Sequence, residues 1–254
     1  MLDKIKNYDF IITLGFYNPM LLPKCDANFY PFLDCETTLY VRYEVGTEEG
    51  VVALFLYEFV HNSADSKLND FINALDYGYL SAESNVSEEE LQMLKNAILK
   101  SKNPLLLVGR DIFAHSRKAN ILNMLSALRQ HSHLEILCEC DSLPQNYALD
   151  SIANLPEHNG CVIFVDYSNS DLAQDSSDSQ DSQIPTLKIS REFARAWRLS
   201  DKQEIRFALD SQEIRAICDL SENFSGIIGI LRGAKGLKQS YPFKNISIHT
   251  ATKG

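Results

Sequence analysis

The sequence of 254 residues has no cluster of lysine and arginine, and its formal net charge is −10. Proteins that bind nucleic acid normally present a basic face, so this charge balance argues against DNA or RNA as a partner. The sequence also has no apolar run of about 18 residues, which a membrane-spanning helix needs. Its first residues lack the apolar segment of a secretory signal. We therefore expect a cytoplasmic protein without direct membrane insertion.

Motifs that identify catalytic or metal-binding sites are missing as well. The sequence contains no G-x-G-x-x-G, no Walker loop, no H-E-x-x-H and no G-x-S-x-G. Its one close cysteine pair is Cys138 and Cys140, whereas a structural zinc site or an iron–sulfur cluster needs about four ligands. We expect free, structural thiols, no metal site, no bound cofactor and no catalytic residue that residue types alone could identify.

The sequence does contain an alternation of short apolar strands and amphipathic helices. Near-continuous apolar strands are predicted at Asp9–Gly15, at Leu105–Gly109 and in the run that begins at Cys161. Ser87 and Glu90 form the signature of a capping box at the start of a helix. This alternation predicts an α/β fold, with a mostly parallel sheet and helices on both faces in a Rossmann-like arrangement.

The stretch from Leu39 to Val60 links a strand to a helix. Its first half alternates apolar and polar residues, as a half-buried strand does, and its second half is apolar around most of a helix. Thr47 is predicted to cap this helix with its side chain. Glu48 and Glu49 fall in the first turn, where the helix dipole favours acidic side chains.

Composition divides the chain into three predicted parts. Residues 1–168 carry the α/β pattern. Residues 169–185 are rich in Ser, Asp and Gln, which predicts a flexible surface loop. Residues 186–254 hold several short strand candidates and one short helix, and we expect them to form a small, irregular C-terminal α/β extension.

Ligands of open parallel sheets bind at the carboxyl ends of the strands. A glycine there lets a phosphate approach the backbone, and the next helix offers free N–H groups. Each strand end also has a plainer interpretation, because a glycine can simply make a turn and a lone arginine can form a surface ion pair. The candidate cofactor-binding residues are Gly15, Asn18, Gly46, Thr47, Gly109 and Arg110.

Four stretches, taken in order and spacing, resemble the molybdopterin oxidoreductase family. One of them is similar to the C-terminal region of the G subunit of bacterial NADH-quinone oxidoreductase, respiratory complex I: this is DYGYLSAESNVSEEEL, Asp76–Leu91. The resemblance covers roughly residues 5 to 170. The other three stretches are NYDFIITLGFYNP (Asn7–Pro19), LYVRYEVGTEEGVVALFLYEFV (Leu39–Val60) and LKSKNPLLLVGRDIFAHSRKANILNMLSAL (Leu99–Leu128).

The sequence departs from the pattern of that family in two corners. The Gly-x-Asn-Pro corner is one residue longer here, from Gly15 to Pro19, and the Gly-Thr-Asp of the family is Gly46-Thr47-Glu48. The cysteine-rich iron–sulfur region and the long cofactor-binding middle of the family have no counterpart in this sequence. The resemblance therefore implies a vestigial domain that kept the fold and lost the pterin chemistry.

Two hypotheses about function follow. The resemblance implies an accessory, non-catalytic component of a respiratory NADH-quinone oxidoreductase-like complex. Such a component would dock on iron–sulfur subunits and lie on the cytoplasmic side of the inner membrane through those partners. The alternative, from the residues alone, is a stand-alone nucleotide-binding or small-molecule-binding α/β protein that uses the loops at Gly15, Gly46 and Gly109.

Overall fold

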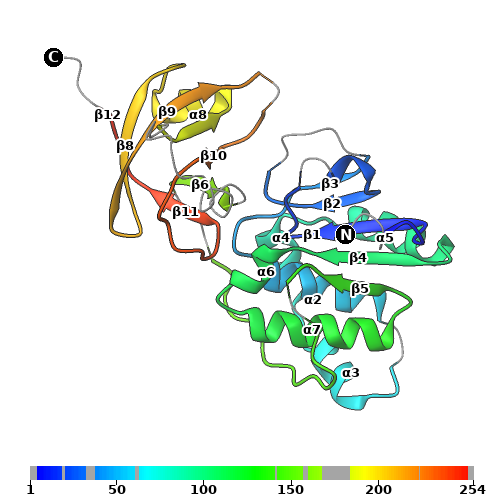
Figure 1. Ribbon diagram of the computed structural model, residues 1–254. Helices are drawn as coiled ribbons and strands as arrows, with labels where there is room; N and C mark the ends of the chain where they lie inside the picture. Colours follow the sequence, from blue (N-terminus) through cyan, green and yellow to red (C-terminus); the bar gives the residue numbers. More distant parts are fainter. Residues whose placement is uncertain are drawn as a thin grey trace, which may run out of the picture. The chain divides into compact units, whose positions relative to one another are not determined.

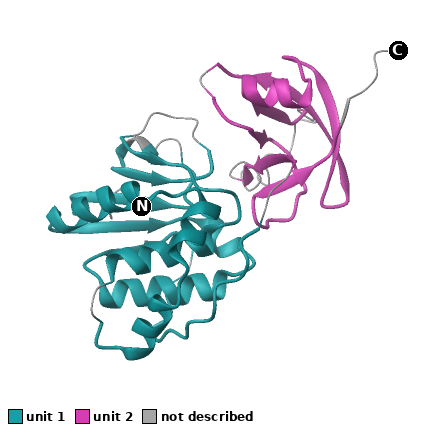
Figure 2. Cartoon of the chain, turned by 180° about the vertical axis from the view of Figure 1, so that it is seen from behind, with its two compact units in different colours: residues 1–156 teal, residues 157–254 magenta. Residues whose placement is uncertain are grey.

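The computed structural model describes residues 5–18, 21–32, 38–60, 63–140, 142–156, 160–167, 184–222 and 224–250. The chain divides into two compact units, Met1–Pro156 and Glu157–Gly254, which Figure 2 shows in different colours. Each unit builds its own sheet around its own apolar core.

The first unit alternates strands and helices along the chain. Its described elements are β1 (Phe10–Leu14), the 3-10 helix η1 (Leu22–Lys24), β2 (Ala27–Phe29), β3 (Tyr40–Val41), α2 (Glu48–Phe59), α3 (Ser66–Asn73), α4 (Tyr77–Ser84), α5 (Glu88–Lys100), β4 (Pro104–Val108), α6 (Arg110–Ala114), α7 (Lys118–His131) and β5 (Glu135–Cys138) (Figure 1).

The described strands of this unit form a parallel sheet in the order β3-β2-β1-β4-β5. The chain steps outward from β1 to β2 and β3, and then crosses back to β4 on the other side of β1. Open α/β sheets bind their ligands where the strand order reverses in this way, here between β1 and β4. The predicted α/β fold with a mostly parallel sheet is confirmed.

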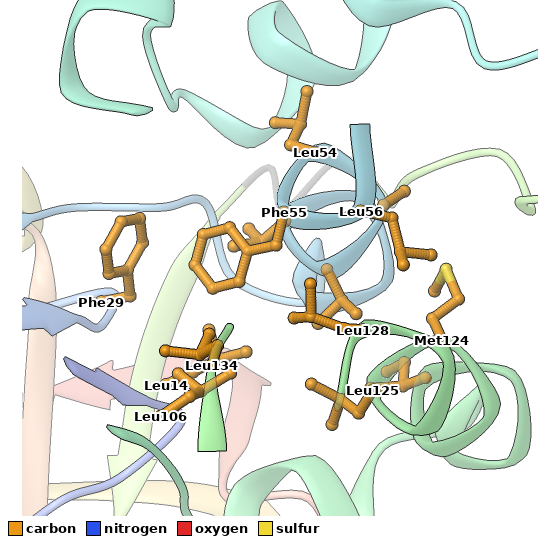
Figure 3. Close-up of a cluster of buried hydrophobic side chains, with 14 of the residues drawn as sticks. Leu14, Phe29, Leu54, Phe55, Leu56, Leu106, Met124, Leu125, Leu128 and Leu134 are labelled. Atoms are coloured by element: carbon orange, nitrogen blue, oxygen red, sulfur yellow. The ribbon is translucent and has the colours of Figure 1, made fainter. Parts of the chain in front are cut away.

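One face of the sheet holds the main core. Ile12 and Leu14 of β1 and Leu106 and Val108 of β4 point to the same side, because alternate residues of a strand share a face. Figure 3 shows Leu14, Phe29 and Leu106 facing side chains of two helices. These helix side chains are Phe55 of α2 and Leu125 and Leu128 of α7, whereas Leu54 of α2 points away from the strands.

The opposite face has a thinner cover. Ile11, Leu105 and Leu107 form a separate buried cluster there with residues in and next to η1, such as Leu22 and Cys25. The long helices α2, α5 and α7 all contribute to the first cluster, on the other face. Both faces of the sheet therefore carry helical structure. Long helices cover one face, and among the described elements the 3-10 helix η1 is the one that packs on the other.

Helix α2 is the central helix of the first unit. Its residues from Val51 to Leu56 are all 0% exposed, and it contacts α3, α4, α5 and α7. A helix with neighbours on every side needs apolar residues around its whole circumference. This explains its all-round apolar sequence.

The predicted capping box of α5 is also confirmed. Ser87 Oγ accepts a hydrogen bond from Glu90 N, and Glu90 Oε2 accepts one from Ser87 N.

The second unit is a curled sheet with one described helix. Its elements are β6 (Cys161–Val165), β7 (Thr186–Ile189), α8 (Arg191–Trp197), β8 (Glu204–Leu209), β9 (Gln212–Leu220), β10 (Ile228–Arg232), β11 (Phe243–Ile246) and β12 (Ile248–Thr250). The order of its described strands is β11-β6-β10-β7-β9-β8-β12, with parallel and antiparallel pairs mixed. β11 also contacts β8, which brings distant strands of the sheet together (Figure 1).

The structure divides the chain at a different place from the predicted domains. The prediction placed β6 in the domain 1–168, whereas β6 pairs with β10 and β11 of the second sheet, and the division follows Pro156. An apolar strand sequence does not specify which sheet it joins, because that depends on distant partners. The described residues from 186 to 250 supply the other strands of this curled, mixed sheet and the helix α8. Residues 168–183, which make up most of the predicted loop 169–185, lie outside the described residues.

Candidate functional site

The candidate residues lie at one edge of the first sheet. Gly15 and Asn18 follow β1, Gly46 and Thr47 lie between β3 and α2, and Gly109 follows β4 directly. This is the carboxyl edge of the parallel strands, where ligands of open α/β sheets bind. The remaining candidate, Arg110, is the first residue of α6.

The structure packs two of the candidate glycines against each other at the switch point. A Cβ atom on Gly109 would lie 2.0 Å from the carbonyl oxygen of Gly15 and 2.3 Å from the Cα atom of Phe16. Gly109 N donates a hydrogen bond of 2.9 Å to Leu14 O, which extends the β1–β4 ladder. Gly15 has a φ of +59°, which glycine adopts without strain. These glycines therefore let the ends of β1 and β4 pack closely.

The loop after β1 adds aromatic side chains to this edge. The Tyr17 ring stacks on Tyr30 at a centroid distance of 5.8 Å and lies 5.3 Å from Phe32. Asn18 is exposed, and its Oδ1 atom accepts a hydrogen bond from Leu21 N, so its side chain supports a local turn.

Thr47 occupies the N-cap position of α2 but does not cap the helix with its side chain, so this prediction was wrong. Its Oγ atom donates instead to Glu44 O at 2.7 Å. The backbone of Thr47, with φ −95° and ψ 15°, lies outside the extended region that an N-cap residue usually adopts. Gly46, with φ +81°, makes the tight turn that precedes it.

Arg110 pairs with a carboxylate of this chain. Glu139, which follows β5, accepts hydrogen bonds from Arg110 N at 3.0 Å and from the guanidinium Nη2 at 3.3 Å. The Arg110 side chain is half exposed, so the ion pair is of the surface kind that contributes about 1 kcal/mol or less. The Glu139 carboxylate lies at the start of α6, beside the backbone N–H of its first residue.

A buried polar cluster lies behind this edge, and its residues are not among the candidates predicted from the sequence. The cluster consists of Tyr30, Tyr43, Glu48, Asp111 and His115, which are all less than 10% exposed. Tyr30 donates a short hydrogen bond to Asp111 Oδ2. Tyr43 donates to Glu48 Oε1 at 3.4 Å. Tyr30 and Asp111 are 81 residues apart in the chain, so no local motif marks this pair.

The contacts of His115 define its tautomer. Nδ1 accepts a hydrogen bond of 3.0 Å from Arg117 N, so the proton of the neutral ring is on Nε2. Nε2 then donates to Gly46 O at 3.1 Å and lies 3.4 Å from Glu48 Oε2. The turn at Gly46 is thus held in place by a side chain that follows α6.

The buried cluster is acidic. The pKa of Asp111 is raised to about 8, mainly by burial and in smaller part by the charges of Glu48 and Glu139, against the opposing effect of the hydrogen bond from Tyr30. Burial also raises the pKa of Tyr43 well above its ordinary value, and the charge of Glu48 adds to this effect. A buried acid with a pKa of about 8 holds its proton at neutral pH.

Glu49, the second glutamate of the Gly-Thr-Glu-Glu turn, does not join this cluster but binds α7 and the segment near Ala153. It is 1% exposed. It accepts hydrogen bonds from Arg117 Nε at 3.0 Å, Asn120 Nδ2 at 2.8 Å and Ala153 N at 3.2 Å. The two glutamates of this turn therefore serve as buried acceptors for other segments of the same chain.

The described residues of this edge do not fit the phosphates of a pterin dinucleotide. An anion needs free N–H groups or cations, but the start of α6 faces Glu139, and Glu48 and Glu49 occupy the first turn of α2. Gly109, which could have admitted a phosphate, contacts the Gly15 backbone instead. In the part of the chain that the structure describes, no group of three or more His, Cys, Asp or Glu side chains could hold a metal ion.

The first unit is therefore an α/β fold in which the carboxyl edge of the sheet is occupied by side chains and backbone of the same chain. No protein-family model matches the chain, and no curated protein sequence matches it either. Among the described residues, no helix has both the length and the apolar character required to cross a membrane.

Proposed function

We propose that this chain is an accessory, non-catalytic component of a respiratory NADH-quinone oxidoreductase-like complex. In this proposal the first unit is a vestigial molybdopterin-type domain that docks on iron–sulfur subunits and binds no pterin. It has no redox centre of its own, and it reaches the cytoplasmic side of the inner membrane through its partners. The proposal starts from the family resemblance of the four quoted stretches.

The observation that supports it best is the closed switch point between β1 and β4. The Rossmann-like strand order is present, but Gly109 packs on the Gly15 backbone and Glu139 lies at the start of α6. A nucleotide that entered here would have to separate two hydrogen-bonded strand ends and displace a carboxylate. A domain that kept such a fold without room for the ligand is suited to a structural role in an assembly.

A native pull-down from membranes of the source cells tests the proposal. The full chain carries a tag, the detergent is mild, and the co-purified proteins are quantified. We expect iron–sulfur quinone oxidoreductase subunits at a fixed ratio to the bait. Because the closed edge binds no ligand in this proposal, the variant Arg110→Ala should retain the same partners. A chain that purifies alone, or one that contains stoichiometric molybdenum or iron, would contradict the proposal.

A thermal-shift screen with nucleotides tests the alternative, a stand-alone nucleotide-binding protein. A ligand present at 100 times its Kd stabilises a folded protein by about 2.7 kcal/mol, so binding is readily detected. We expect no shift for the full chain. A shift that Arg110→Ala abolishes would move the assignment to the alternative, because Arg110 is the candidate cation of that edge.

A further inference from the structure

A long irregular segment of the first unit is held in place by side chains of α7. We call this segment, residues 142–156, the strap. Asn120 both donates to Asp150 O at 2.9 Å and accepts from Asp150 N at 2.9 Å. Three further side chains, three or four residues apart on α7, donate to strap carbonyl groups: Asn123 to Ala148 O, Ser126 to Pro144 O and Gln130 to Gln145 O.

The last residues of the strap are fixed by hydrogen bonds and packing on the side that faces the helices of the first unit. Ala153 N donates to Glu49 Oε2 at 3.2 Å, and Leu155 N donates to Tyr79 Oη at 3.0 Å. The Leu155 side chain is buried against Gly50 of α2, where an added Cβ would lie 2.8 Å from it. Ala153 and Leu155 are two residues apart, so both turn their N–H groups toward side chains of the helices, although the stretch belongs to no strand of the sheet.

The outer edge of the same stretch is open. Within the described part of the chain, the N–H and C=O groups of Ile152 and Asn154 make no hydrogen bond, and neither residue is buried. A cavity of about 400 Å³ lies beside them. It is lined mainly by apolar groups of the α3–α4 corner and of the strap, among them Phe71, Ala74, Leu75, Tyr79, Leu80 and Ile152.

One acidic side chain lines the cavity. Among its lining residues, Asp76 alone carries a carboxylate, and none is Lys, Arg or His. Asp76 Oδ1 accepts from Tyr79 N as the N-cap of α4. Among the described residues, Asp76 forms no ion pair, so the carboxylate is available to a cation from outside.

We propose that this cavity is a docking site for an extended peptide segment of a partner protein, with a large apolar side chain next to Lys or Arg. The apolar side chain enters the cavity, the basic residue pairs with Asp76, and the peptide backbone hydrogen-bonds to Ile152 and Asn154. Free backbone groups beside an apolar pocket are the recognition elements of β-strand addition. The proposal goes beyond the proposed function and does not depend on it, because its test contains no oxidoreductase subunit.

The experiment uses the full chain and fluorescein-labelled peptides as probes. The peptides are KLKFKLK, its acidic counterpart ELEFELE, and KLKFKLK with N-methyl groups on alternate backbone amides. We expect the basic peptide to bind at least about tenfold more tightly than either of the others in fluorescence anisotropy. In amide hydrogen exchange, we expect the N–H groups of Ile152 and Asn154 to exchange rapidly in the free protein and to be protected by the basic peptide.

Matched variants separate docking from general attraction to an acidic protein. Asp76→Ser removes the carboxylate but keeps an N-cap side chain, whereas Glu83→Gln removes the same charge from a residue of α4 outside the cavity. Ala74→Trp fills the cavity from an exposed position. We expect Asp76→Ser and Ala74→Trp to weaken binding and Glu83→Gln to leave it unchanged. Equal weakening by both charge variants, or binding without protection of the two amides, would overturn the proposal.

Discussion

The substitution Gly109→Ala tests the closed edge directly. Gly109 has a φ of −83°, so alanine can adopt its backbone conformation and any destabilisation must come from packing. The new Cβ would lie 2.0 Å from the carbonyl oxygen of Gly15, whereas ordinary contacts begin at 3.4 Å. The loop after β1 must therefore move by about 1.4 Å, because the atoms that the new Cβ meets are backbone atoms, which cannot rotate away as the end of a side chain can.

The expected cost follows from what that movement disturbs. Overpacking costs about 1 to 3 kcal/mol. The displacement also weakens the hydrogen bonds from Gly109 N to Leu14 O and from Gly15 N to Phe29 O, each worth about 1 kcal/mol. We expect Gly109→Ala to lower the free energy of unfolding by about 3 to 5 kcal/mol, which shifts Tm of a unit of this size by roughly 10 °C.

Urea and thermal unfolding, followed by circular dichroism, measure this cost against two alanine controls. Gly78 lies in α4 with 3.6 Å of space to its nearest neighbour, so Gly78→Ala should stabilise by about 0.5 to 1 kcal/mol. Gly233, with φ +76° and open space, should show only the backbone cost of about 1 kcal/mol. If Gly109→Ala is no worse than Gly233→Ala, the strand ends separate easily and the edge can admit a ligand, which would refute the reasoning.

Three further predictions concern the buried acids and one turn. The pKa of Asp111 is raised to about 8 from 3.8, so the stability that its protonated form contributes is complete below about pH 4 and is lost as the pH rises toward 8. Asp111→Asn should therefore become progressively more stable than the wild type over this range, by on the order of 4 kcal/mol at pH 7, in urea titrations. Glu49→Ala should lower the free energy of unfolding by about 3 kcal/mol and accelerate hydrogen exchange at Ala153 N, because it leaves buried donors without an acceptor. Asp210 and Ser211 both have positive φ in the β8–β9 hairpin, so Ser211→Gly should stabilise by about 0.5 to 1 kcal/mol in thermal unfolding.

Each of these predictions has an outcome that contradicts it. A stability difference between Asp111→Asn and the wild type that does not change with pH would mean that this carboxyl is ionised in the folded protein. Glu49→Ala should cost far more than Glu44→Ala, since Glu44 is exposed; equal costs would show that the strap does not need its buried acceptor. Destabilisation by Ser211→Gly would indicate that the Ser211 side chain contributes more than its backbone strain costs.

The pattern of residues near one another in the sequence predicted the local structure well. The capping box of Ser87 and Glu90 and the apolar run of α2 depend on neighbours within a few residues, and both occur as predicted. The alternation of β8 is a local property of the same kind, because Ile205, Phe207 and Leu209 share its buried face. Thr47 is the local exception: residue type favoured a helix cap, but the turn at Gly46 sets a backbone conformation that turns Oγ back to Glu44.

Contacts between distant segments could not be predicted in this way. Asp111 is recognised as a buried acid only when Tyr30, which follows β2, and Glu48 of α2 are placed beside it. Glu139 lies at the start of α6 because β5 pairs with β4 in a particular register. A residue type carries no information about such neighbours, so the candidate list contained the glycines of the edge but not its buried acids.

The sequence by itself therefore determined the α/β class, the main helices and the positions of the strand ends, because hydrophobic periodicity and capping are local properties. Only the tertiary structure decided that β6 joins the second sheet, that the switch point between β1 and β4 is closed, and that the strap leaves one edge free beside a cavity. These features depend on which surfaces meet across long separations in the chain, and the free energy of packing and of buried hydrogen bonds selects among arrangements that local patterns do not distinguish.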